Sequence, residues 1–180
     1  EQVLPEIPPK RDLNQQEDTG VKIIPETLII LAPKELQNII DIESYKNKLI
    51  GIEQSVQQLY NLALSIEQDY NQKGYPLVRA FLPTQELEPD QATVFIKVVD
   101  GFIEKLDLSQ VPSSQIFRTY RYLRPLIKKK GLKLDEIERK LLLAGSSAGL
   151  SLTSTLSPGI SEGGTVLAIQ AKHKLISGGV

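Results

Sequence analysis

The spacing of apolar residues divides the first half of the chain into strands and helices. Over residues 51–72, apolar side chains recur at steps of three and four, which predicts a long amphipathic helix. The Ile- and Val-rich run at residues 21–31 predicts a strand before it, and Pro25 inside this run suggests an edge position. Pro33 suits the first position of a short helix that we expect to end near Asp41.

Two further strands are predicted after the long helix, and the same order then returns. Residues 77–82 form an apolar run that Pro83 stops, and residues 93–99 form a β-rich run that ends at Asp100. The second half predicts strand 102–108, helix 113–123 capped at Ser113 or Ser114 and ended by Pro125, helix 135–147 with Asp135 and Glu138 spaced as a capping box, and strands 150–156 and 165–171.

The two halves match one another at a fixed offset of 75 residues. Gly74 corresponds to Gly149 and Pro83 to Pro158, each behind a helix with the same apolar face. The sequence therefore predicts an α+β fold with two tandem β-α-α-β-β units, each a three-stranded sheet packed against two helices. We place a Pro-rich flexible linker at residues 1–20, the units at 21–100 and 101–176, and the start of a further link at 177–180.

Composition removes several classes of chemistry. The chain has no cysteine, which excludes disulfides and thiolate sites, and its one histidine, His173, has no visible catalytic or metal-binding partners. We expect no enzyme activity and no cofactor. The net charge of −1 argues against a nucleic-acid binder that relies on bulk charge.

One basic cluster is present in the second half of the chain. It is a candidate patch for an acidic partner or nucleic acid, although a solvated helix face is the simpler interpretation. Its residues are Arg118, Arg121, Arg124, Lys128, Lys129 and Lys130.

The backbone offers a second kind of site. A three-stranded sheet has two edges, and each edge carries unpaired N–H and C=O groups that an extended partner segment can pair with. Our first candidate for such client contact is the edge strand formed by Leu77, Val78, Arg79, Ala80, Phe81 and Leu82.

Motifs in the first half carry a family resemblance. Lys73-Gly74-Tyr75, Leu82-Pro83-Thr84-Gln85 and the run from Phe95 to Gly101-Phe102-Ile103 resemble the first POTRA domain of two-partner secretion transporters, the haemolysin-activator type of the Omp85 superfamily. Asp90 departs from the pattern, because a glycine is common there. More loosely, Arg124-Pro125, the helix start at residues 135–139 and Ser157-Pro158-Gly159 resemble the second POTRA domain.

The resemblance implies a role in protein export. It gives structural roles to Gly74, Tyr75, Pro83, Gln85 and Gly101. It implies a periplasmic POTRA pair that belongs to an outer-membrane protein, with the transporter's own C-terminal β-barrel outside this chain. The pair would bind the N-terminal secretion domain of a secreted partner protein and deliver it to the pore, without inserting into the membrane. The alternative is a POTRA scaffold in a barrel-assembly or division complex.

Overall fold

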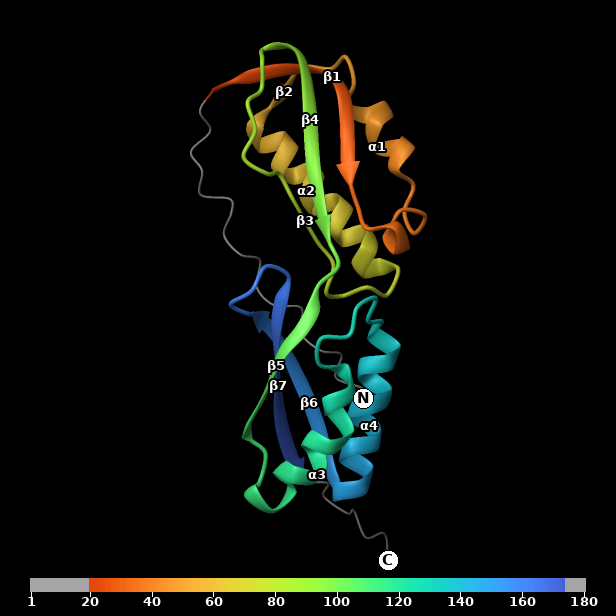
Figure 1. Ribbon diagram of the computed structural model, residues 1–180, viewed down its shortest axis with the longest axis vertical. Helices are drawn as coiled ribbons and strands as arrows, with labels where there is room; N and C mark the ends of the chain where they lie inside the picture. The colour runs from red at the N-terminus through yellow and green to blue at the C-terminus, as the bar shows by residue number, and fades with distance from the viewer. Residues whose placement is uncertain (1–19, 174–180) are drawn as a thin grey trace, which may run out of the picture. The chain divides into compact units, whose positions relative to one another are not determined.

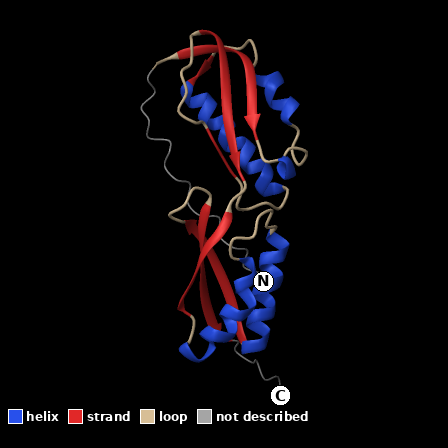
Figure 2. Ribbon diagram, in the orientation of Figure 1, coloured by secondary structure: helices blue, strands red, loops and turns tan. Residues whose placement is uncertain are grey.

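The computed structural model describes residues 20–173, which form two compact units divided between Asp100 and Gly101 (Figure 1). The predicted linker at residues 1–20, except its last residue, and the predicted link at 177–180 lie outside the described residues. In each unit a sheet carries helices on one face (Figure 2). Among the described residues, no helix is both long and apolar enough to cross a membrane.

The N-terminal unit is a mixed sheet with two α-helices. Its elements are β1 (Lys22–Leu31), the 3₁₀ turn η2 (Lys34–Leu36), α1 (Ile42–Leu49), β2 (Gln54–Ser55), α2 (Val56–Gln72), β3 (Arg79–Phe81) and β4 (Asp90–Val99). The sheet order is β2-β1-β4-β3, with β1 and β4 parallel and the outer pairs antiparallel. The two-residue strand β2 adds a fourth strand to the three that the sequence predicted.

The first helix lies later in the chain than predicted. Residues 33–41 do not form an α-helix, because Pro33 starts only the short turn η2. Helix α1 begins after Asp41, whose side chain accepts a hydrogen bond from the backbone N–H of Ser44 and so caps the helix. A capping box between Ser55 and Gln58 likewise starts α2 several residues after the predicted beginning.

The core of the N-terminal unit lies between the sheet and its helices. Its buried side chains come from β1, both helices, β3 and β4, and all lie between Ile23 and Val98. Two tyrosine hydroxyls link α2 to the elements before it, one to η2 and one to α1. The Tyr70 hydroxyl donates to the carbonyl of Leu36 over 2.9 Å, and the Tyr45 hydroxyl donates to the Asp69 carboxylate. Burial, aided by the bond to Asp69, raises the pKa of Tyr45.

The C-terminal unit repeats this connectivity. Its elements are β5 (Phe102–Gln110), α3 (Ser113–Leu123), the 3₁₀ turn η3 (Arg124–Leu126), α4 (Leu134–Ala148), β6 (Leu150–Pro158) and β7 (Gly164–His173). The sheet order is β5-β7-β6, with β5 and β7 parallel and β6 and β7 antiparallel. The predicted α+β fold with two β-α-α-β-β units is therefore confirmed.

The helix ends of the C-terminal unit correct two predictions and explain two glycines. Neither Ser113 nor Ser114 caps α3, because both lie inside the helix, whose N-cap residue is Pro112. No side chain caps α4, whose N-cap residue is Lys133, so the predicted capping box between Asp135 and Glu138 is wrong. Asp135 instead lies in the first turn, where its charge complements the helix dipole. Gly149 ends α4 with a φ of 67°. Gly145 lets α4 approach β6, because a Cβ there would lie 2.7 Å from the carbonyl oxygen of Leu150.

Candidate functional site at the sheet edges

The predicted client-binding edge strand lies at one border of the N-terminal sheet, but it is short. Only Arg79–Phe81 form β3, instead of residues 77–82. Leu77 is buried before the strand begins, and Leu82 packs against the core after it ends. The backbone N–H of Val78 bonds to the carbonyl of Tyr75 over 3.3 Å, so this turn replaces the first part of the predicted strand.

A side chain from α2 occupies the outer edge of β3. The Glu67 carboxylate accepts the backbone N–H of Ala80 over 3.0 Å. The same carboxylate pairs with the Arg79 guanidinium at 3.2 Å, and both side chains are partly buried. All three residues of β3 are register partners of β4, with Ala80 opposite Val98. The bond to Glu67 shows that the N–H of Ala80 points away from β4, to the outer side of the sheet. The edge donors at Val78 and Ala80 are therefore both satisfied within the protein.

Gln85, a motif residue of the resemblance, extends the sheet beyond β3. Its amide group accepts the backbone N–H of Phe95 over 2.8 Å and donates to the carbonyl of Phe95 over 2.9 Å. These are the two bonds that another strand residue would make to β4. Because Pro83 has no backbone N–H to donate, the side-chain amide takes over the pairing where the strand stops.

The other motif residues have positions in turns and junctions. Gly74 ends α2 with a φ of 87°, a conformation that favours glycine. The N–H of Tyr75 bonds to the carbonyl of Tyr70, the last core residue of α2, over 3.0 Å. Gly101 is buried between β4 and β5.

The residues of the basic cluster lie on α3, in η3 and in the turn that follows it. Arg118 and Arg121 are exposed on α3. Lys129 forms an ion pair with Glu136 at 2.6 Å, and the ammonium group of Lys130 lies 4.4 Å from the ring centre of Phe102. Lys128 occupies a turn residue with a φ of 58°, and its backbone N–H bonds to Ile103 of β5.

The strongest candidate edge is β1, which the sequence did not single out as a binding site. Strand β2 pairs only with Lys22 and Ile23, and the N–H of Gly51 then bonds to the carbonyl of Pro25 over 2.8 Å. Pro25 therefore marks the point where pairing on this side ends. Beyond it, the strand runs on to Leu31 with β4 on one side only.

The register shows which backbone groups of β1 face outward. Gln85 occupies both backbone groups of Phe95, so these groups point away from β1, and those of Val94 and Ile96 point toward it. In a parallel ladder, Val94 and Ile96 bond to the neighbours of their partners Leu28 and Ile30. The N–H and C=O groups of Leu28 and Ile30 thus face outward. Within residues 20–173, no group outside the sheet hydrogen-bonds to them.

A groove runs beside this open edge. It has a volume of about 590 Å³ and lies between β1, the segment that follows η2 and the first turns of α1. Its apolar lining comes from Leu28, Ile29, Ile30, Ile40 and Ile42, and its polar lining from Gln37, Asn38, Asp41, Glu43 and Lys46.

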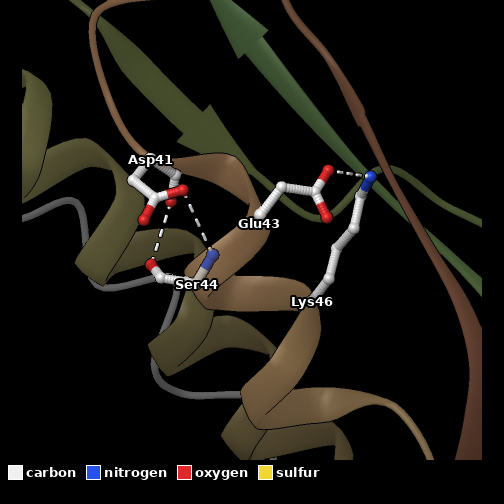
Figure 3. A network of polar contacts seen from close by, with 4 residues as sticks. All are labelled: Asp41, Glu43, Ser44 and Lys46. Carbon is white, nitrogen blue, oxygen red and sulfur yellow. Dashed lines mark hydrogen bonds and ion pairs between the residues drawn. The ribbon is translucent and has the colours of Figure 1, made fainter.

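The polar rim of the groove is ordered by the start of α1 (Figure 3). Asp41 caps the helix through Ser44, which also returns a hydrogen bond from its hydroxyl to the Asp41 carbonyl over 2.9 Å. Glu43 and Lys46 form an ion pair at 2.7 Å one turn apart. The rim thus holds two carboxylates and one ammonium group.

In the C-terminal unit, the strand β6 borders the sheet along nine residues. The turn that follows it is built around Glu104 of β5. Its carboxylate accepts the backbone N–H groups of Ile160 and Ser161 and the Ser161 hydroxyl. The Ser161 bonds are the main reason that the pKa of Glu104 lies below its ordinary value. No group of three or more side chains that could hold a metal ion is found within residues 20–173.

Comparison with solved structures places the fold among POTRA-bearing proteins. CdiB from Escherichia coli is 18% identical with a TM-score of 0.62, over 94% of this chain and 30% of that one. CdiB from Acinetobacter baumannii is 14% identical with a TM-score of 0.57, over 96% and 34%. POTRA1-3 of the periplasmic domain of Omp85 from Anabaena is 12% identical with a TM-score of 0.51, over 86% and 67%. The chain thus spans about a third of the length of the CdiB chains.

Sequence comparison adds the family. No curated protein matches the sequence. The model for POTRA domains of the ShlB type, however, matches residues 30–101, which include α1, α2, β3 and β4. The match confirms the resemblance that the motifs around Gly74 and Gln85 indicated: over residues 30–101, the chain is similar to POTRA domains of the ShlB type.

Proposed function

We propose that this chain is the periplasmic POTRA region of an outer-membrane two-partner secretion transporter. In this role it binds the secretion domain of an exported partner protein in extended form and delivers it to the β-barrel pore of the same transporter. The ShlB-type family match and the fold shared with CdiB support this assignment.

The observation that carries the binding role is the presence of open strand edges in both units. β1 is unpaired on its outer side after Pro25, and β6 borders the C-terminal sheet. Each added strand hydrogen bond contributes about 0.5–1.5 kcal/mol net. A few such bonds give reversible binding that depends little on side chains, which suits a client that must be released again.

Titration of the isotope-labelled chain with the secretion domain of the partner tests this function. We expect amide chemical shifts to change along at least one sheet edge, and to reverse when the client is diluted. A folded protein of similar size with no secretion domain is the control. Complete absence of shift changes at high client concentration would overturn the proposed function.

A scaffold role in barrel assembly is the second candidate, and the similarity to the POTRA domains of Omp85 favours it. The two roles predict different neighbouring genes and different binding partners. A secretion transporter is encoded beside a large exported protein, and a tagged full-length protein should co-purify with that protein. Co-purification with outer-membrane assembly factors instead would favour the scaffold role.

A further inference from the structure

We propose that the outer edge of β1, at Thr27–Leu31, and the groove beside α1 are where an extended polypeptide adds to the N-terminal sheet. This inference rests on the proposed function and names the site that performs it. The added segment lies in line with β2, which already pairs with the first residues of β1. Its backbone bonds to the outward groups of Leu28 and Ile30.

The two borders of this sheet differ in their protection against strand addition. Proteins usually guard edge strands by keeping them short, by charges or by proline. β3 has only three residues, carries Arg79, has its outward N–H occupied by Glu67 and is followed by Pro83. Residues 27–31 of β1, by contrast, contain no charged residue and no proline. The sheet is protected against strand addition at β3 but not at β1, which indicates that a partner segment binds at β1.

Exposed apolar side chains gather on the β1 side. In the N-terminal unit, the large hydrophobic residues with substantial exposure are Val21, Ile24, Leu31, Ile50 and Ile52. Three of them belong to β1 or adjoin it, and two lie in the segment that joins α1 to β2. None lies on β3. Apolar surface concentrated in this way marks an interaction site more often than scattered exposure does.

The groove defines the chemistry of the segment. Alternate side chains of an added strand point to the helix side of the sheet, where Ile40 and Ile42 line the groove. These positions favour apolar residues. The rim holds two carboxylates against one ammonium group, so a segment with a lysine or arginine beside its apolar residues fits better than an acidic one. The same rim disfavours a second copy of this chain, because two such rims would face each other.

A peptide probe tests the strand geometry. We suggest a short peptide of alternating valine and threonine with a lysine at each end, titrated against the full chain. Two analogues carry N-methyl groups on all valines or on all threonines. Because alternate N–H groups of a strand point to opposite sides, we expect one analogue to bind like the parent and the other to bind at least about tenfold more weakly. Equal loss with both analogues would overturn strand addition.

Cysteine variants locate the binding edge, since the natural chain has no cysteine. Asn38→Cys carries a bulky maleimide on the exposed rim of the groove, and Thr84→Cys carries the same group at an exposed residue just beyond β3. We expect the label at residue 38 to weaken peptide binding at least about tenfold and the label at residue 84 to have no effect. The reverse result would overturn the proposal.

The same labelled variants separate this inference from the proposed function. If the partner's secretion domain binds the unlabelled chain but ignores the label at residue 38, the edge assignment is wrong and the function stands. If the secretion domain does not bind the unlabelled chain, the proposed function itself fails. A concentration-dependent dimer that only the residue 38 label abolishes would assign this edge to a second copy and overturn the proposal.

Discussion

Two polar side chains close the β3 border of the N-terminal sheet. Glu67 reaches from α2 to the outward N–H of Ala80, and Gln85 reaches from a loop to both backbone groups of Phe95. Each occupies groups that a neighbouring strand would otherwise take. Neither contact follows from hydrophobic spacing, because each joins a side chain to backbone elsewhere in the chain.

Removal of Glu67 should destabilise the N-terminal unit. Glu67→Ala leaves the N–H of Ala80 and the guanidinium of Arg79 without their carboxylate, and we expect a loss of about 1–3 kcal/mol in the free energy of unfolding. Urea denaturation measures it. The control is Glu53→Ala, which removes an exposed ion pair with Lys22 and should leave the free energy of unfolding nearly unchanged. Equal effects would show that Glu67 is only a surface charge.

Replacement of the Gln85 amide by a carboxylate should also lower the stability of the N-terminal unit. Gln85→Glu keeps an acceptor for the N–H of Phe95 but turns the donor into an oxygen that faces the Phe95 carbonyl. We expect about 1–3 kcal/mol of destabilisation in thermal or urea unfolding at neutral pH. Gln57→Glu, on the exposed face of α2, is the matched control and should change stability by about 0.5 kcal/mol at most. An equally small effect of Gln85→Glu would contradict the role of the amide.

The turn after β6 should respond to acid. Hydrogen bonds from Ser161 keep the pKa of Glu104 below the ordinary value of 4.5. The pKa of Glu104 is lower in the folded chain than in the unfolded chain. The ionised carboxylate therefore stabilises the turn fully at pH values above the unfolded-state pKa. This contribution is lost as the pH falls through the folded-state value.

Amide shifts during an acid titration measure this effect. We expect the amide signals of Ile160 and Ser161 to move together as Glu104 is protonated. In Glu104→Gln the same signals should stay constant over that pH range. A midpoint at or above 4.5 in the natural chain would contradict the hydrogen-bonded geometry.

At the scale of elements, the spacing of apolar residues predicts which segments form helices and strands, but not where each one begins and ends. The β-α-α-β-β order of the main elements along the chain is confirmed in both units. The α-helix predicted at residues 33–41 is wrong, because Pro33 starts only a 3₁₀ turn and the N-cap residue Asp41 starts the α-helix after it. β3 is shorter than predicted because a turn before it and Pro83 after it take the backbone out of the sheet.

The open edge of β1 lay beyond sequence reasoning for a different reason. An apolar run such as residues 27–31 looks the same whether a neighbouring strand covers it or not. Its exposure depends on β2 ending after two residues, which is a property of the folded arrangement. Pro25 was the one available signal, and it marks the residue where the pairing with β2 ends.

The packing of α4 on β6 gives a prediction in which two effects oppose each other. Alanine is favoured over glycine inside a helix by about 1 kcal/mol. At residue 145, however, a Cβ would lie 2.7 Å from the backbone oxygen of Leu150, which cannot move away as a side chain could. We expect Gly145→Ala to lower stability by about 1–3 kcal/mol. The exposed neighbour Ser146→Ala should be neutral or slightly stabilising, and a similar gain at residue 145 would contradict the close packing.

At the scale of the whole molecule, each unit has its own sheet and helices. The core cluster between Ile23 and Val98 belongs entirely to the N-terminal unit. A unit with its own core is expected to fold alone. We therefore expect a fragment of residues 20–100 to unfold cooperatively and to bind the alternating peptide as the full chain does. Circular dichroism and the same titration measure both. A fragment without cooperative unfolding would show that the core does not suffice.

The parallel pairing of β1 and β4 has a mechanical consequence. The N-terminal end of β1 and the C-terminal end of β4 lie at opposite ends of this ladder, which runs from Ile24–Asp90 to Leu31–Lys97. A pulling force applied at these two ends loads the ladder along the strands, in shear, so its hydrogen bonds share the load and do not open one after another. We expect the N-terminal unit to resist extension until the whole ladder gives way, and then to lengthen in a single step.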